Sequence, residues 1–128
     1  MNTSRETFDK SEKLCSRKII GTLFDNGNIF YNSLFKVVWD KYQISSSGPA
    51  QVAFSVSKRG FRLAVTRNLI KRRMREAYRK NKNTLYDHLI SQNIKIAFVV
   101  ILRGNAVPDY LTIEKSIKEM INKLIMLN

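Results

Sequence analysis

SKRGFRLAVTRNLIKRRMREAYRKNK, residues 57–82, is a strongly basic segment that holds eleven of the 23 lysines and arginines and a single acid, Glu76. A helix that turns by about 100° per residue sorts its side chains, from Arg67 onward, into two neighbouring arcs. The apolar arc comprises Ile70, Met74, Ala77 and Tyr78. The basic arc spans about 140° and comprises Arg67, Asn68, Lys71, Arg72, Arg75 and Arg79. The pattern predicts a helix that packs one side on a scaffold and presents the other to an anionic partner.

The positive charge of this helix needs a counter-charge from outside the chain. Like charges four residues apart, such as those of Arg67, Lys71 and Arg75, repel each other by a few tenths of a kcal/mol per pair. A helix that only kept the protein in solution would carry more acids among its bases. With a formal net charge of +13 over 128 residues, the chain is expected to bind a polyanion, and nucleic acid is the class that fits best.

Residues 54–79 resemble the signature of the bacterial ribonuclease P protein component, a small basic protein that pairs with a catalytic RNA. The family pattern runs S-V-S-K-K, a link containing glycine, then A-V-x-R-N-R-I-K-R-x-x-R-E. The matching residues here are Ser55, Val56, Ser57, Lys58, Arg59, Ala64, Val65, Arg67, Asn68, Ile70, Lys71, Arg72, Arg75 and Glu76. Two departures stand out: Leu69 replaces an arginine of the pattern, and the link at residues 60–63 is one residue longer. We hypothesise that Arg73, one turn later, makes the phosphate contact of the missing arginine.

Length and composition indicate one domain over residues 1–128, with residues 1–13 as a polar, mobile arm that Phe8 and Leu14 anchor to the body. One cysteine and one histidine argue against a disulfide and a zinc site and suit a cytoplasmic location. No segment reaches about 18 apolar residues, and the N-terminus lacks the apolar region of a signal peptide. A membrane-surface role is disfavoured because the basic helix lacks Trp and Phe on its apolar side.

Hydrophobic patterning predicts the remaining elements. Ser16 is a candidate N-cap of a short first helix, and Gly27 a candidate C′ residue that closes it. Strands are expected at 29–31, 34–42, 51–57 and 94–102, the last buried on both faces, with helical turns at 84–91 and an amphipathic helix around 113–125. The fold class is therefore α+β, a single mixed sheet packed with helices in the order α-β-β-β-α-β-α. The resemblance implies a left-handed β-α-β crossover and a fold similar to the second domain of ribosomal protein S5.

The first helix and the third strand carry a second candidate site. Alternation directs Val52, Phe54 and Val56 to one face of the sheet, and the small residues Ala53, Ser55 and Ser57 to the other. The resemblance implies that the single-stranded leader of precursor tRNA binds between this small-residue face and the first helix. The candidate leader-binding residues are Ile20, Phe24, Ser55, Ser57, Lys58 and Arg59, with Phe24 as a stacking ring. Asp25 is a weak candidate for holding a hydrated Mg²⁺.

The sequence carries no pattern of catalytic residues. Its ten acids are scattered, and no Ser, Cys or metal-ligand residue stands at a catalytic or metal-binding spacing from His88. His88 is therefore interpreted as a surface or packing residue. Trp39 is interpreted as a packing residue, because lone tryptophans usually pack. The resemblance implies that RNA and bound Mg²⁺ cut the phosphodiester at the 5′ end of mature tRNA. This chain would then bind the catalytic RNA and need no other protein partner. The residues expected to hold that RNA are Arg67, Asn68, Lys71, Arg72, Arg73, Arg75 and Arg79.

Two alternatives remain within nucleic-acid binding. A structural RNA-binding protein, such as a ribosomal protein, would share the charge, the small size and the α+β build. A DNA-binding role is weaker, because no helix-turn-helix pairing precedes the basic helix.

Overall fold

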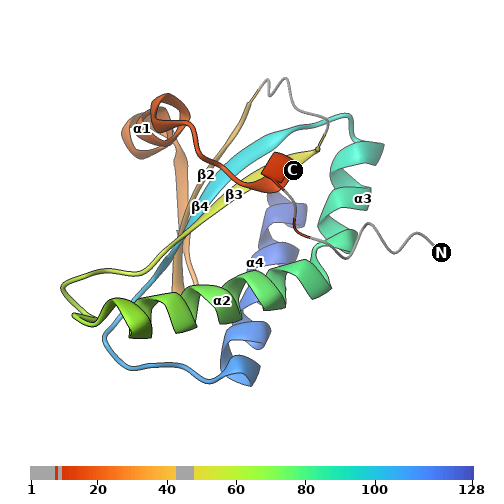
Figure 1. Cartoon of the computed structure of the whole chain (residues 1–128). Helices are drawn as coiled ribbons and strands as arrows, with labels where there is room; N and C mark the ends of the chain where they lie inside the picture. The colour runs from red at the N-terminus through yellow and green to blue at the C-terminus, as the bar shows by residue number, and fades with distance from the viewer. Residues whose placement is uncertain (1–7, 9, 43–47) are drawn as a thin grey trace.

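The computed structural model describes Phe8 and residues 10–42 and 48–128 of the chain. A 3₁₀ turn, η2, precedes a mixed arrangement of helices and strands (Figure 1). The elements and their bounds are η2 (Lys10–Glu12), α1 (Arg17–Asn26), β1 (Asn28–Tyr31), β2 (Phe35–Lys41), β3 (Ala50–Ser55), α2 (Ala64–Asn81), α3 (Asn83–Ser91), β4 (Ile96–Leu102) and α4 (Tyr110–Leu127). The predicted order is confirmed, and each predicted strand lies within two residues of its expected bounds.

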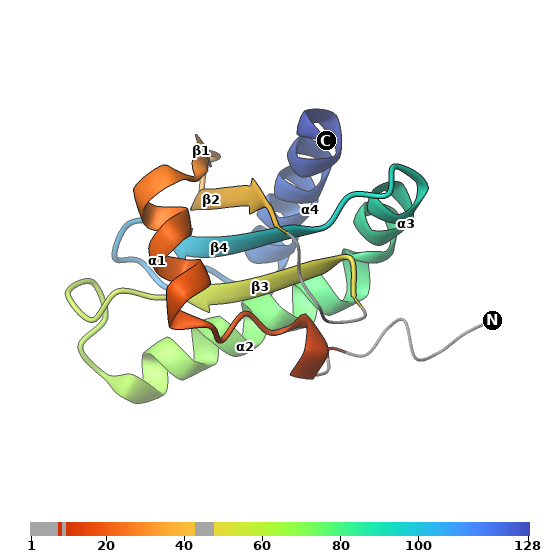
Figure 2. The same cartoon turned by 90° about the horizontal axis from the view of Figure 1, so that it is seen from above.

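The four strands form one mixed sheet in the order β1-β2-β4-β3. β2 pairs antiparallel with both β1 and β4, whereas β3 runs parallel to β4, with Val52 opposite Phe98. The connection from β3 through α2 and α3 to β4 passes on the side of the sheet away from α1, and it is left-handed (Figures 1 and 2). Such crossovers are rare, so this feature agrees with what the family resemblance implied.

The sheet separates two unequal cores. On one face α2, α3 and α4 cover the larger core, in which Phe35, Val37, Trp39, Val52 and Phe98 pack against the helices. On the other face α1 lies across the sheet (Figure 2), and it covers the smaller core together with Leu14. β4 contributes to both cores, because it is central and its alternate side chains point to opposite faces. The interpretation of Trp39 as a packing residue is confirmed.

α1 begins and ends where the sequence predicted, but its end differs in conformation. The Ser16 side chain accepts a hydrogen bond from the Ile19 amide at 3.3 Å, as an N-cap does. Gly27 has φ −71° and donates to the Leu23 carbonyl, so it is not the left-handed C′ glycine that we expected. Glycine fits here for a different reason: a Cβ would lie 2.4 Å from the Leu23 oxygen. Close backbone approach, not positive φ, therefore selects glycine.

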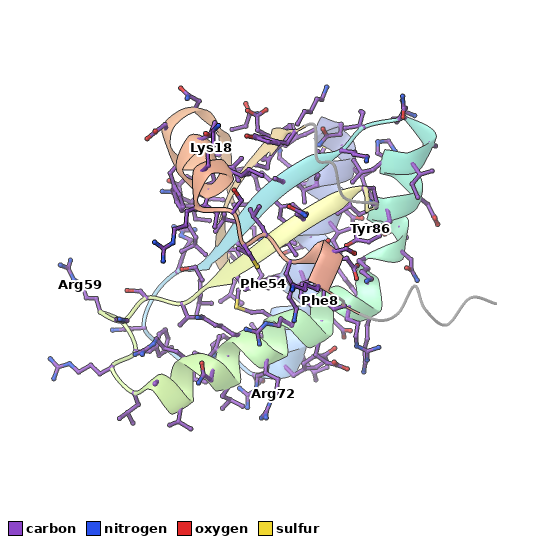
Figure 3. All side chains as sticks on the ribbon, turned by 45° about the horizontal axis from the view of Figure 1, so that its top comes forward. Phe8, Lys18, Phe54, Arg59, Arg72 and Tyr86 are labelled. Atoms are coloured by element: carbon purple, nitrogen blue, oxygen red, sulfur yellow. The ribbon has the colours of Figure 1, made fainter. Side chains whose placement is uncertain are left out.

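The end of the predicted N-terminal arm packs against the body. Lys13 pairs with Val52, and the Leu14 amide donates to the Val52 carbonyl at 2.9 Å. Phe8 makes an edge-on contact with Phe54 (Figure 3). Phe8 and Leu14 thus anchor this segment as predicted, whereas the 3₁₀ turn at Lys10–Glu12 was not predicted. Residues 1–7 and 9 lie outside the described part of the chain.

A buried ion pair that the sequence did not reveal joins this segment to the junction of α2 and α3. The Lys82 ammonium group contacts the Glu12 carboxylate, and the Tyr86 hydroxyl donates to the same carboxylate at 2.8 Å. Tyr78 in turn donates to Tyr86 at 3.1 Å. Burial raises the pKa of both tyrosines well above its ordinary value, so both hydroxyls stay protonated. The network compensates the buried positive charge of Lys82, which is only 1% exposed.

Within the described residues, no helix has both the length and the apolar character that a membrane span requires.

Candidate nucleic-acid interface

α2 sorts its side chains as the sequence predicted. Ile70, Met74, Ala77 and Tyr78 are completely buried against the sheet and α4. On the side of α2 that faces away from the sheet, Asn68, Arg72 and Arg75 are exposed, and Lys71 is half-buried beside them. We call these four residues the outward face of α2. Figure 3 shows Arg72 directed away from the body.

Arg67 lies on the flank of α2 and has an intramolecular role. Its Nη1 donates to the backbone carbonyls of Phe61 and Arg62, at 2.7 and 2.9 Å. These bonds fix the link before the helix. At Gly60 this link passes close to the loop that follows β4, so that a Cβ on Gly60 would lie 3.1 Å from the Gly104 carbonyl oxygen. Arg67 therefore helps to hold the basic turn at residues 57–63 in place.

Arg73 points to the other flank, toward α4. Its Nη1 donates to the Pro108 carbonyl at 2.8 Å, and the residue is half-buried. Leu69, one turn earlier, is also half-buried. Arg73 thus fixes the loop before α4, and it lies beside the outward face instead of within it.

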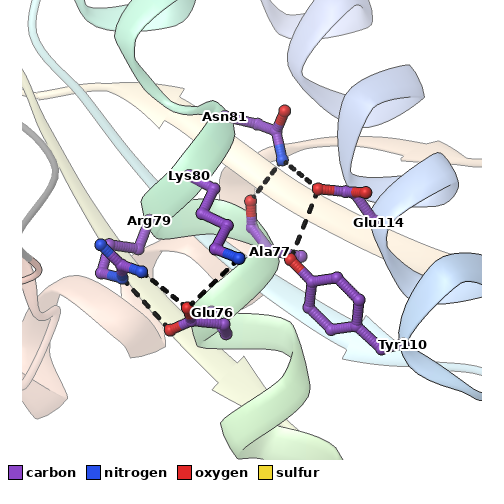
Figure 4. Close-up of polar contacts among 7 residues, drawn as sticks. All are labelled: Glu76, Ala77, Arg79, Lys80, Asn81, Tyr110 and Glu114. Carbon is purple, nitrogen blue, oxygen red and sulfur yellow. Dashed lines mark hydrogen bonds and ion pairs between the residues drawn. The ribbon is translucent and has the colours of Figure 1, made fainter.

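Arg79 is paired with the one acid of the helix. Its guanidinium group donates to both Glu76 carboxylate oxygens, at 3.1 and 2.6 Å, and Lys80 lies 3.8 Å from the same carboxylate (Figure 4). The hydrogen bond from Arg79, followed by the charges of Arg79 and Lys80, lowers the pKa of Glu76. Close by, Asn81 donates to the Ala77 carbonyl and to Glu114 (Figure 4). The positive charge is therefore least compensated in the N-terminal two thirds of α2.

The opposite face of the sheet brings together residues from α1 and β3. Ala53 packs with Ile19 and Ile20 in the smaller core. Ser55 is half-buried, and strand alternation places it on the same face as Ala53. Phe24, on the last turn of α1, leaves 50% of its surface exposed. α1, which carries the half-exposed Phe24, thus covers the same face of the sheet that presents the small residues Ala53 and Ser55.

Beyond β3 the chain forms an exposed basic turn. Ser57, Lys58 and Arg59 are all exposed, and the Ser57 hydroxyl accepts a hydrogen bond from the Arg59 amide at 3.1 Å. Arg59 extends into solvent (Figure 3). Ser57 therefore shapes the turn and is not part of the strand, contrary to the prediction of a strand through residue 57.

Asp25, the weak candidate for a contact with hydrated Mg²⁺, is exposed on α1.

Arg103 adds a positive charge that the sequence reasoning missed. It follows β4 directly, donates to the Asn32 carbonyl at 2.8 Å and lies over the Tyr31 ring at 5.0 Å. The sequence feature that could have indicated this role is the position of Arg103 directly after the predicted central strand. Such a position lies at the carboxyl edge of the sheet, near the turn that follows the parallel strand β3.

A sequence model of the family described as Ribonuclease P matches residues 8–125. The chain belongs to the ribonuclease P protein family. The ribonuclease P protein component of Porphyromonas gingivalis (strain ATCC 33277) is 36% identical over 126 residues, covering 95% of this chain and 90% of that relative. That of Chlorobium phaeobacteroides (strain DSM 266) is 40% identical over 80 residues, covering 60% of this chain and 55% of the relative.

Solved structures of ribonuclease P proteins share the fold. The protein from Staphylococcus aureus, at 24% identity, superposes with a TM-score of 0.69 over 90% of this chain and 95% of its own. The protein from Thermotoga maritima, at 22% identity, gives a TM-score of 0.70 over 88% of this chain and 96% of its own. The predictions of family and fold class are confirmed, and the family supplies part of an endoribonuclease.

The individual roles of the predicted ribonuclease P site residues stay predictions. The structure places Asn68, Lys71, Arg72 and Arg75 together on the outward face of α2. Arg67, Arg73 and Arg79 hold intramolecular partners. His88 is half-buried in α3, and its Nε2 atom is buried with no hydrogen-bond partner among the described residues.

Proposed function

We propose that this chain is the protein subunit of a cytoplasmic ribonuclease P, the ribonucleoprotein that removes the 5′ leader from precursor tRNA. The observation that carries the proposal is the outward face of α2, an uncompensated basic surface in a chain of the ribonuclease P family with a net charge of +13. In the proposed enzyme the RNA subunit performs catalysis, and the protein binds that RNA and the substrate.

The outward face of α2 binds the phosphates of the catalytic RNA in this proposal. Asn68, Arg72 and Arg75 are exposed and Lys71 is half-buried, so the face can approach an RNA backbone without rearrangement of the core. The first turn of α2 has no side-chain cap, which leaves backbone amides to add positive potential at this end. Each phosphate that the face contacts releases counterions and makes the affinity dependent on salt.

Arg67, Arg73 and Arg79 support this surface from its edges. Arg67 donates to two backbone carbonyls and Arg73 to one, in each case through Nη1. A guanidinium group carries five N–H donors. A phosphate contact from Nε or Nη2 is therefore compatible with these bonds from Nη1. The hypothesis that Arg73 replaces the arginine absent at position 69 therefore stays a proposal, with the flank toward α4 as the place of contact.

The leader of precursor tRNA binds on the α1 face of the sheet in this proposal. Phe24 is half-exposed there, and an unstacked base on such a ring contributes about 1–3 kcal/mol. Ile20 and Ser55 lie on the same face, and small side chains such as Ser55 permit a strand of RNA to approach the sheet closely. The exposed turn with Ser57, Lys58 and Arg59 supplies charge for the leader phosphates.

Mg²⁺ is held by RNA phosphates in the proposed enzyme. Within residues 8, 10–42 and 48–128 no group of three or more His, Cys, Asp or Glu is arranged to hold a metal ion. Asp25 is a lone exposed carboxylate, which fits at most a water-mediated contact with a hydrated ion. The chain contributes to Mg²⁺ use by lowering the repulsion between two RNAs, so that fewer ions are needed.

Reconstitution with the cognate catalytic RNA tests the proposal. The protein is expected to allow cleavage of a 5′-extended tRNA at a Mg²⁺ concentration at which the RNA alone is inactive, and to cut nothing by itself. Cleavage by RNA-free protein would refute the assignment of catalysis to the RNA. Copurification with ribosomal RNA, without a separate structured RNA, would instead favour the ribosomal-protein alternative.

A further inference from the structure

α1 is held on the sheet by few of its own side chains. Of its ten residues, all within the described part of the chain, only Leu23 is buried, whereas Ile19 and Ile20 are half-buried at the smaller core. A helix this short is marginal in water and depends on its neighbours. The contacts of α1 are chiefly with β2 and β4, so its position relative to β3, the strand that carries Ser55, needs a further support.

The segment Lys10–Leu14, which we call the N-terminal strap, supplies that support along the outer edge of β3 (Figure 2). The Leu14 amide donates to the Val52 carbonyl at 2.9 Å, and the Gln51 side chain donates to the Ser11 carbonyl at 3.2 Å. Because β3 is an edge strand, its outer side is open to such pairing. The strap is therefore bound to β3 at Val52 and at Gln51.

The strap leads directly into α1. The Leu14 side chain packs in the smaller core together with Leu23. Two residues later Ser16 caps the helix, which begins at Arg17. Consecutive Cα atoms lie only about 3.8 Å apart, so the start of α1 cannot move far while Leu14 stays in place. The strap thus sets where the N-terminal half of α1 lies over the sheet.

The strap is also anchored on the opposite face of the sheet, in the larger core. The Glu12 carboxylate contacts the buried Lys82 ammonium group and accepts from the Tyr86 hydroxyl at 2.8 Å. Lys82 is the C-cap of α2. Phe8, just before the strap, makes an edge-on contact with Tyr78, with 5.8 Å between the ring centroids. The strap therefore crosses the edge of the sheet and connects α1 with the helix that carries the outward face.

We propose that Glu12 is a positioning residue for the leader of precursor tRNA, and this rests on the proposed function. Glu12 itself touches no RNA. It docks the strap on Lys82 and Tyr86, and the strap holds the start of α1 on β3. The space between α1 and the small-residue face of β3 is thereby fixed before the leader binds. Such preorganisation strengthens binding, because the leader does not have to order the site.

Release of the strap affects the two proposed RNA sites differently. The end of α1 stays fixed, because β1 follows it directly and pairs with β2. α1 then turns about this end and displaces Ile20 and Phe24 relative to β3. The outward face of α2 is positioned by the buried stripe of that helix and not by α1. Binding of the catalytic RNA is therefore expected to be independent of the strap.

Glu12→Gln tests the proposal, because it keeps the length of the side chain and an acceptor for Tyr86 but removes the charge that pairs with Lys82. In the reconstituted enzyme, the preference for precursor over mature tRNA is expected to fall about fivefold. The affinity for the catalytic RNA and its salt slope should stay unchanged. In the free protein, hydrogen exchange of the α1 amides is expected to accelerate about tenfold more than that of the β4 amides, since the opening is local.

Gln51→Ala is a second variant, in case Glu12→Gln folds poorly. It removes the bond to the Ser11 carbonyl and leaves the buried ion pair in place. The same changes are expected at a smaller size, with a loss of preference of about twofold.

Two controls separate positioning from charge and from a general loss of stability. Glu119→Gln, at an exposed position of α4, makes the same change of charge away from the strap. Ile117→Ala removes apolar contact from the larger core, so it lowers the melting temperature through α4 instead of the strap. Both variants should keep the wild-type preference for precursor tRNA.

The double variant Glu12→Leu with Lys82→Met tests whether docking of the strap or its charge matters. Apolar replacement of a buried ion pair is often neutral or stabilising, so the strap should dock again and the preference should return to within about twofold of the wild type. A preference that is unchanged in Glu12→Gln, that falls as far in Ile117→Ala, or that stays low in the double variant overturns the proposal. A wild-type enzyme with no preference for precursor over mature tRNA would instead refute the proposed leader site itself.

Discussion

Replacing Glu12 by alanine tests the buried network that joins the N-terminal segment to the junction of α2 and α3. Lys82 is 1% exposed and its ammonium group contacts the Glu12 carboxylate, which also accepts from Tyr86. Removal of the carboxylate takes away an ion-pair partner of a buried cation, which costs about 3–5 kcal/mol. A domain of this size has a free energy of unfolding of only about 5–15 kcal/mol, so the variant should be close to unfolding in mild denaturant.

Urea unfolding of a double-mutant cycle measures the contribution of the pair. Lys82→Met leaves the carboxylate buried and is also expected to destabilise strongly. The double variant Glu12→Ala with Lys82→Met removes both charges, so its cost should be smaller than the sum of the two single costs by about 1–3 kcal/mol. Glu119→Ala, at an exposed position of α4, is the control and should change stability by less than about 0.5 kcal/mol. Additive costs, or a cost below about 1 kcal/mol for Glu12→Ala, would show that the pair is solvated and that our account of it is wrong.

Three further predictions follow from single residues. Phe24→Ala should leave assembly with the catalytic RNA intact and reduce the preference for precursor over mature tRNA by about 1–3 kcal/mol; equal binding of both tRNAs by the wild-type protein would contradict the stacking role. Gly27→Ala should lower the midpoint of thermal unfolding, because its Cβ would meet the Leu23 carbonyl oxygen at 2.4 Å, and an unchanged midpoint would show that the turn relaxes freely. Asp109 caps α4, and the hydrogen bond from the Thr112 amide lowers its pKa. The stability that Asp109 provides is therefore present above the pKa of its unfolded state and is lost as pH falls through its lower pKa in the folded state. The difference in melting temperature between wild type and Asp109→Ala should accordingly shrink in acid and persist at neutral pH.

The elements that the sequence revealed are those with local, periodic signals. The apolar arc of Ile70, Met74, Ala77 and Tyr78 proved completely buried, since a helical period fixes which side chains share a face. The continuous apolar run before residue 102 predicted the central strand for the same kind of reason, because burial on both faces removes alternation. α2 begins at Ala64, three residues before the predicted basic arc, and no capping side chain marks that start.

The contacts that the sequence did not reveal join residues far apart in the chain. Glu12 and Lys82 are separated by 70 residues, and an isolated acid and an isolated lysine carry no sign that they will be buried together. Arg67 and Arg73 looked equivalent to Arg72 and Arg75 as basic residues of one helix. Only the neighbouring loops decide that the first two donate to backbone carbonyls and the last two face solvent.

Gly27 shows a limit of a different kind. The sequence placed the end of α1 correctly, yet the backbone there has φ −71° and not the left-handed conformation. Glycine permits both conformations, so its presence alone could not distinguish them. The position of the Leu23 carbonyl, a tertiary detail, supplies the reason.

The salt dependence of binding to the catalytic RNA is the most direct test of the claim that the outward face of α2 contacts RNA phosphates. The slope of log affinity against log salt is measured for the wild type, Arg72→Ala, Arg75→Ala and, as a control, Lys123→Ala at an exposed position of α4. Loss of one phosphate contact should reduce the slope by about 0.7–0.9 in each arginine variant and leave it unchanged in the control. Slopes that fall equally in all three variants, or in none, would contradict the assignment of this face to the RNA.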